Sequence, residues 1–116
     1  MIIAVQGSRT FSDYNVFLRA MAVGMSSMKP EDNILHIYSV GPARINSMAM
    51  EFVNLSEKGM KLRGKKIKMF HTAPNWLFEN INTIDYFAYM SSPDEPISKL
   101  TKNAQEQNIE VGIFRY

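Results

Sequence analysis

Cysteine is absent from the 116 residues, which excludes disulfides and thiolate metal sites and fits a protein of a reducing compartment. No apolar run approaches membrane-spanning length. The first five residues are too short for a signal-peptide core and lack its basic leader. We therefore expect a cytoplasmic protein that has no membrane association.

Excess charge is nearly absent as well. The chain has 13 Lys and Arg residues against 11 Asp and Glu, a formal net charge of +2 that is well short of a nucleic-acid-binding composition. Six cations form one dense cluster, for which a solvated loop is a better interpretation than a phosphate-backbone contact: Lys58, Lys61, Arg63, Lys65, Lys66 and Lys68. A nucleic acid is therefore not an expected partner.

Apolar residues, in contrast, make up 46% of the chain, which is enough to build a core without covalent staples. The length is that of one domain, and the sequence has no internal repeat, low-complexity tract or linker. We therefore expect a single domain over residues 1–116.

The most informative stretch is the first one. Residues 1–6 form an apolar run rich in β-branched side chains, which predicts a buried strand, and the run stops at Gly7. Ser8 and Arg9 follow, and Ser12 is a candidate N-cap for a first helix. Gly7 would permit a positive φ and the close approach of a ligand. Arg9 offers a planar fork of donors for phosphate or carboxylate, although an ordinary strand–helix corner with Arg9 in solvent explains the pattern equally well.

Strands and helices then alternate along the chain. Further strands are predicted at residues 34–40, 66–70, 83–90 and 109–114. Apolar side chains at spacings of three and four predict helices between them, with inner faces formed by Tyr14, Phe17, Leu18, Met21, Met25 and Met28, then by Ile45, Met48, Ala49, Phe52 and Val53, and finally by Ile97, Leu100, Thr101 and Ala104.

Turn-forming residues mark the connections. Pro42 suits the first turn of the second helix, and Gly59 and Gly64 bracket a basic connection. Asn75 is a candidate cap for a short helix, and Asn108 is a candidate stop for the last one.

This alternation predicts an α/β protein, a single Rossmann-like domain with a doubly wound, five-stranded parallel sheet in the order 3-2-1-4-5. In such sheets ligands bind outside the carboxyl ends of the strands, where the strand order reverses. We expect that crevice between the first and the fourth strand.

The opening GSRTFSD at residues 7–13 resembles the GSR-x-[FW]-x-D start of the YspA/YpsA-like branch of the SLOG superfamily. These Rossmann-like domains include relatives of DprA and of the cytokinin-activating phosphoribohydrolases. The likeness continues in order along the chain, with YSVGPARIN at 38–46 in place of a strand and HGGARGAD, IDYFAY at 84–89 and NIEV at 108–111. Only the first of these motifs is specific.

The resemblance implies a three-walled site for a nucleotide, a nucleotide-derived signal or a phosphosugar. Its walls would be Gly7, Ser8 and Arg9, then Gly41 and Arg44, then Ser91 and Ser92. The sequence also departs from the family. One glycine remains in the second motif, Ile45 replaces the glycine after Arg44, and residues 91–96 contain none of the glycines that hold phosphate in the phosphoribohydrolases. Glu95 is nearby but outside the family's context, so a capping role is favoured over catalysis.

Three functions remain open. The retained half of the site favours non-catalytic binding of the nucleotide-like ligand; a small domain of this kind could also be encoded by a virus or phage and sequester a host signal. A protein-interaction or assembly role, with a crevice that has lost its ligand, would use the basic loop and the aromatics between Trp76 and Tyr89. An N-glycosidic hydrolase is disfavoured, because the glycine loop and the catalytic glutamate of the phosphoribohydrolases are missing. The chain also shows no Ser-His-Asp or Cys-His set and no metal spacing, and no cofactor is expected. Relatives commonly associate, so we expect a homo-oligomer.

Overall fold

Five parallel strands form one sheet in the computed structural model, which describes residues 1–116. The strands are β1 (Ile2–Gly7), β2 (Ile34–Val40), β3 (Lys66–His71), β4 (Tyr86–Ser91) and β5 (Glu110–Arg115). Their order is β3-β2-β1-β4-β5, so β1 is central and pairs with β2 on one side and with β4 on the other. The predicted α/β, Rossmann-like fold and its strand order are confirmed.

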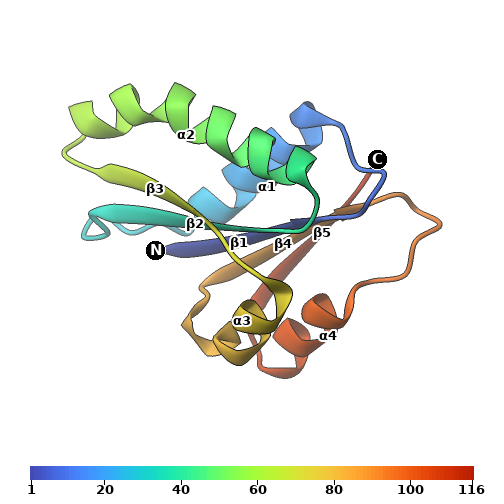
Figure 1. The fold of residues 1–116 in the computed structure, drawn as a ribbon. Coiled ribbons are helices and arrows are strands. Elements are labelled where there is room, and N and C mark those ends of the chain that lie inside the picture. The colour runs from blue at the N-terminus through green and yellow to red at the C-terminus, as the bar shows by residue number, and fades with distance from the viewer.

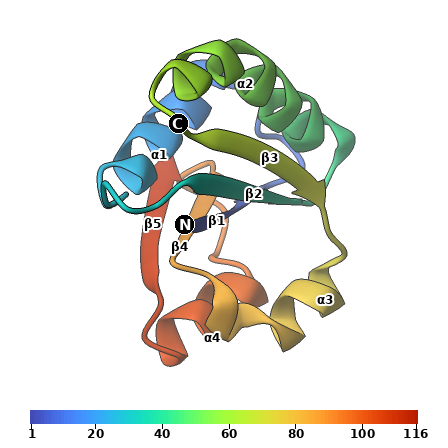
Figure 2. The same cartoon turned by 90° about the vertical axis from the view of Figure 1, so that its left-hand side faces the viewer.

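Helices cover both faces of the sheet (Figures 1 and 2). The helices α1 (Tyr14–Met25) and α2 (Ala43–Leu62) lie on one face, and α3 (Pro74–Glu79) and α4 (Lys99–Glu106) lie on the other. A short 3₁₀ turn, η1 (Ile81–Thr83), precedes β4. None of the helices combines the length and the apolar character that crossing a membrane requires.

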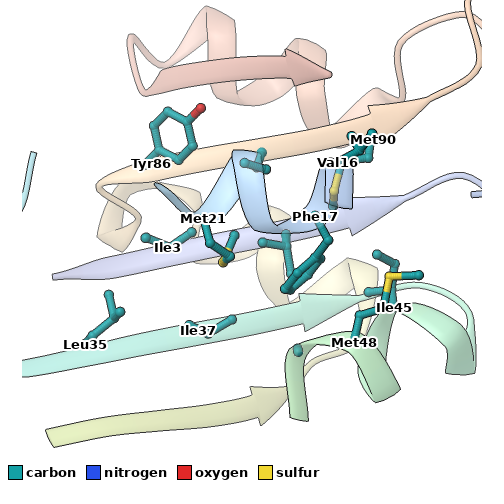
Figure 3. Close-up of a cluster of buried hydrophobic side chains, with 14 of the residues drawn as sticks. Ile3, Val16, Phe17, Met21, Leu35, Ile37, Ile45, Met48, Tyr86 and Met90 are labelled. Carbon is teal, nitrogen blue, oxygen red and sulfur yellow. The ribbon is translucent and has the colours of Figure 1, made fainter. Parts of the chain in front are cut away.

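Two apolar clusters, one on each face, hold the layers together. The larger comprises 17 buried residues from the sheet, the loop after β1, α1 and α2, and Figure 3 shows two of them, Phe17 and Met21 of α1. The smaller comprises nine buried residues from the sheet, α3, η1, α4 and the residue after η1, Ile84. Alternation along β1 serves both clusters, because Ile3 and Val5 belong to the first and Ala4 to the second.

The starts of three helices differ from the predictions. The N-cap of α1 is Asp13 rather than Ser12, because the Asp13 carboxylate accepts hydrogen bonds from the amides of Asn15 (3.0 Å) and Val16 (3.3 Å). Pro42 is the extended residue before α2 instead of part of its first turn. Asn75 lies within α3, for which Ala73 is the N-cap.

Helix ends follow their backbone chemistry. The helix α2 runs through Gly59, where a side chain would meet no atom within 4 Å, so the predicted basic connection from 59 is wrong in its first half. Gly64 ends the helix at φ 72°, with Lys65 N–H donating to Met60 (2.9 Å). Asn108 ends α4 at φ 61°, with Ile109 N–H donating to Ala104 (2.9 Å), and this predicted stop is confirmed.

The inner face of α1 also differs in part. Leu18 is 37% exposed, whereas Ala20 and Gly24 are buried. Gly24 lies against β1 and β4, where an added Cβ would come within 2.9 Å of Ile3 and Tyr86 side-chain atoms. The fourth strand begins at Tyr86 and not at residue 83, because residues 81–83 form η1.

Truncation of Phe17, which is fully buried in the larger cluster, should cost about 3–5 kcal/mol of unfolding free energy when it is replaced by Ala. Leu18→Ala is the matched control, since Leu18 lies next to Phe17 on the same helix but is 37% exposed and belongs to neither apolar cluster, and it should cost less than about 1 kcal/mol. Urea unfolding of both variants is the measurement. Equal losses would mean that α1 packs through a different face.

Candidate functional site

The predicted site lies where the strand order reverses, at the carboxyl ends of β1 and β4. The two strands run side by side with Gly7 opposite Met90, and the Ser8 amide donates to the Met90 carbonyl (2.9 Å). The chain then turns sharply, with the Phe11 amide donating to the Ser8 carbonyl (3.1 Å). Phe11 is 1% exposed and anchors this turn in the core. The loop after β1 is therefore held firmly beside β4.

Gly7 serves packing rather than conformational freedom. Its φ is not positive, and a Cβ at this position would lie 2.5 Å from Cγ1 of Ile45 in the first turn of α2. Ile45 replaces the glycine of the family motif, and its buried side chain fills the space beside the Gly7 backbone. The expected positive φ at Gly7 is wrong.

Gly41 is the glycine that needs its conformational freedom. It has φ 116°, and a Cβ there would lie 3.4 Å from the Gly7 carbonyl oxygen. The residue after it, Pro42, caps α2 without a side-chain hydrogen bond. The ends of β1 and β2 therefore meet beside the first turn of a 20-residue helix whose N-cap makes no side-chain hydrogen bond, although the Ile45 amide donates to the Pro42 carbonyl (3.0 Å).

Arg9 and Arg44 stand at this junction. Arg9 is in the loop after β1, and Arg44 is in the first turn of α2. Both are exposed, and neither side chain makes a hydrogen bond or an ion pair. Both guanidinium groups are thus free to meet an anion from solvent.

The third predicted wall, in contrast, is already engaged within the protein. Arg115 at the end of β5 donates to the Ser91 hydroxyl (2.6 Å), the Ser92 carbonyl (2.8 Å) and the Glu95 carbonyl (2.7 Å). Ser91 itself is fully buried as the last residue of β4. Arg115 therefore fixes the path of the loop after β4.

Glu95 lies between the two loops, with its carboxylate among hydroxyl groups. Its Oε1 accepts from the hydroxyls of Ser92 (2.9 Å) and Thr10 (3.0 Å) and, at 3.4 Å, from the Ser92 amide. The Ser92 hydroxyl is the main reason that the pKa of Glu95 lies below its ordinary value of 4.5; partial desolvation opposes it, and the Thr10 hydroxyl assists it. The Ser8 hydroxyl is buried but has no hydrogen-bond partner. The Glu95 carboxylate thus binds the hydroxyl of Ser92, a residue that the sequence analysis assigned to the ligand site.

Sequence reasoning missed three participants in this network. Thr10 joins Glu95 to the Tyr116 hydroxyl (2.8 Å), the Tyr116 ring meets Phe11 edge to face with centroids 5.3 Å apart, and Arg115 binds the loop after β4. Arg115 and Tyr116 lie more than 80 residues from the opening motif. No local pattern connects them to it.

The arrangement lacks an enclosed cavity. None of the four hollows in the structure is lined by Arg9, Arg44 or the loop after β4, and the largest lies elsewhere, over β2 and β3. No group of three or more His, Asp or Glu side chains is placed to hold a metal ion. The candidate site is therefore an open edge of the sheet that carries Arg9 and Arg44. Beside it lies the loop after β4, whose polar groups are already hydrogen-bonded within the protein. A ligand would bind there from the surface.

No protein-family model matches the sequence, and no curated protein or solved structure matches it either. The resemblance to the SLOG superfamily therefore remains a prediction that rests on the motifs quoted above.

The contact between Gly7 and Ile45 can be tested by a double-mutant cycle. Gly7→Ala should cost about 1–3 kcal/mol, because its Cβ would overlap the Ile45 side chain. In an Ile45→Ala background the same change should cost much less, since the space is then free. Urea unfolding of the four proteins measures the coupling. Equal costs in the two backgrounds would contradict the steric explanation.

Glu95→Gln should lower the melting temperature at neutral pH, because a neutral amide is a weaker acceptor for the Ser92 and Thr10 hydroxyls. A lowered folded-state pKa stabilises the fold above the ordinary value of 4.5, and that contribution is lost as the pH falls through the folded-state pKa. The difference between wild type and variant should therefore shrink in acid. Asp94→Asn, whose carboxylate has no hydrogen-bond partner, is the control; a difference that is constant with pH would refute the assignment.

Proposed function

We propose that this protein is a non-catalytic binding module for a small phosphate-bearing ligand: a nucleotide, a nucleotide-derived signal or a phosphosugar. The proposal rests above all on the exposed and unpartnered side chains of Arg9 and Arg44 at the adjoining ends of β1 and β2. The resemblance of residues 7–13 to the SLOG opening motif supports it independently of the geometry.

The phosphate would lie between the two arginines at the start of α2. An arginine can bind two phosphate oxygens at once, and hydrogen bonds between charged groups are the stronger kind. The first turn of α2 adds amides without a side-chain cap and the positive end of a helix dipole. Gly41 keeps the backbone beside this turn free of a side chain.

The rest of the ligand would extend toward Ser8 and the loop after β4. There it has to compete with the Glu95 carboxylate for the hydroxyls of Thr10 and Ser92, and with Arg115 for Ser91. A ligand group that is itself anionic is disfavoured beside Glu95. The proposed orientation therefore places the phosphate near Arg44 and the sugar or base toward the loop.

Catalysis is disfavoured on the same geometry. Hydrolysis of an N-glycosidic bond needs an acid to assist the leaving base. Glu95 lies between the loops after β1 and β4, and its lowered pKa keeps it ionised at neutral pH, when it could not donate a proton. A protein-interaction role was based partly on the aromatic residues between Trp76 and Tyr89. Three of these, Tyr86, Phe87 and Tyr89, are buried in the core and cannot contact a partner.

Arg9→Ala and Arg44→Ala should each weaken binding of adenosine monophosphate by roughly 1.5–3 kcal/mol, about ten- to a hundredfold. The corresponding lysine variants should restore only part of the loss, because an ammonium cannot reproduce the bidentate contact. Isothermal titration is the measurement, with inorganic phosphate as the second probe and melting temperatures alongside.

Arg19→Ala is the matched control, since Arg19 is an exposed arginine of α1 that also lacks a partner. It should leave the affinity unchanged. Equal weakening by all three alanine variants would indicate a general effect of net charge and no built site. Unchanged affinity in both Arg9→Ala and Arg44→Ala would refute the proposal.

A further inference from the structure

The largest hollow of the molecule lies away from the two arginines, on the sheet face that α3 and α4 cover. It has a volume of about 540 Å³ and is lined by Tyr38, Phe70, His71, Thr72, Ala73 and Trp76. These residues come from β2, from the end of β3 and the segment after it, and from α3. None of the residues proposed for the phosphate site lines this pocket.

Three aromatic rings form a corner in the pocket. The Tyr38 ring meets Phe70 at a centroid distance of 5.4 Å and an angle of 69°, and it meets Trp76 at 5.3 Å and 89°. Phe70 and Trp76 are each 42% exposed. Edge-to-face contacts leave ring faces available to a further ring, and such contacts are favourable beyond the area that they bury. The shape and the chemistry both suit a flat aromatic group.

The charges around the pocket decide which aromatic group fits. Residues 66, 68 and 70 alternate along β3 and therefore share one face, on which the exposed Lys66 and Lys68 precede Phe70; both lysines also line a separate hollow with Glu57 and Lys61 of α2. No Asp or Glu lines the pocket. Aromatic corners often hold cations, but neighbouring ammonium groups oppose a cationic ligand and favour an anionic one.

His36 extends this surface toward the amino end of β2. Its ring is tilted against Phe70 at 5.7 Å. Burial, followed by the charges of the amino terminus and Lys68, lowers the pKa of His36. Lys68 is the register partner of His36 across β2 and β3, so it borders a residue that contacts the pocket wall.

One polar group in the pocket wall is unpaired. The Thr72 hydroxyl is shielded from solvent and has no hydrogen-bond partner within the protein. Rotation about its Cα–Cβ bond toward the pocket would therefore give up no existing hydrogen bond. A ring with a polar edge could use that hydroxyl.

We propose that this pocket binds a planar aromatic ring that carries an anionic group, at a site separate from the one between Arg9 and Arg44. A nucleotide and an aromatic carboxylate share this chemistry. The ring stacks in the corner of Tyr38, Phe70 and Trp76, and Lys68 faces the anionic group.

Trp76 reports on the pocket directly, because it is the only tryptophan of the chain. Its fluorescence should change saturably on titration with adenosine monophosphate or nicotinate. The change should need more adenosine, which lacks the charge, and should be absent with inorganic phosphate, which lacks the ring. The probe that saturates at the lower concentration, nucleotide or aromatic carboxylate, identifies the source of the ring.

Phe70→Ala should weaken the binding of the better probe about tenfold or more, as loss of a stacking partner does elsewhere. Phe78→Ala is the matched control, because Phe78 is an exposed aromatic of the same helix as Trp76 but does not line the pocket. Lys68→Glu should remove the preference for the charged probe over adenosine, whereas Lys102→Glu on α4 should keep it. If Phe70→Ala does not fold, the comparison of Lys68→Glu with Lys102→Glu tests the proposal in its place.

Arg9→Ala and Arg44→Ala separate this site from the proposed phosphate site. They should leave the Trp76 titration unchanged, even if they abolish the calorimetric binding of inorganic phosphate, which the pocket does not bind. A titration that never saturates, or one that is lost in Arg44→Ala, would overturn the proposal. So would sedimentation data in which the wild type is a dimer and Phe70→Ala a monomer, because a second copy would then cover the pocket.

Discussion

The structure depends on the burial of β1 on both of its faces. Because all five strands run in the same direction, every connection has to return over one face of the sheet to the start of the next strand. Each of these crossovers places a helix on that face. A central strand in such a sheet needs apolar side chains in both directions, which Ile3, Ala4 and Val5 supply. The contact of Ile45 with Gly7 then fixes the start of α2 at the end of this strand. The same constraint brings the ends of β1, β2 and β4 to one edge, where Arg9 and Arg44 stand.

The fold could be predicted because its signals are local and repeated. Apolar runs of strand length and helical spacings alternate along the whole chain, and right-handed crossovers leave few arrangements for them. The errors fall where neighbouring residues compete for one role. Ser12 and Asp13 are both good N-caps, and only the contact with the Asn15 amide decides between them. Glycine usually predicts the end of a helix, but Gly59 lies in an exposed turn of α2, where neither its backbone nor its surroundings interrupt the helix.

The positions of candidate site residues could be predicted only where single residues follow the ends of strands. Gly41 has the positive φ that glycine permits, and Arg9 and Arg44 lie at the edge where the order of elements placed them. The pairing of Ser91 with Arg115 spans 24 residues of sequence and depends on how β5 aligns with β4. The aromatic corner likewise draws one ring from each of three elements. Such contacts follow from tertiary packing, and no spacing in the sequence encodes them.

The two faces of the sheet are covered unequally, so the helical layer on one face, α1 and α2, is more stable to local opening than the layer on the other, α3 and α4. The helices α1 and α2 contribute 12 and 20 residues and help to bury a cluster of 17, whereas α3 and α4 contribute 6 and 8 and help to bury a cluster of nine. Local opening is cheapest where the least apolar surface is lost, so the α3–α4 layer can detach at lower free energy than the layer opposite. Trp76 lies in α3, in the less stable layer, whereas Arg44 lies in α2, in the more stable one. The aromatic pocket can thus adjust its shape to an incoming ring, while the cationic edge keeps its geometry.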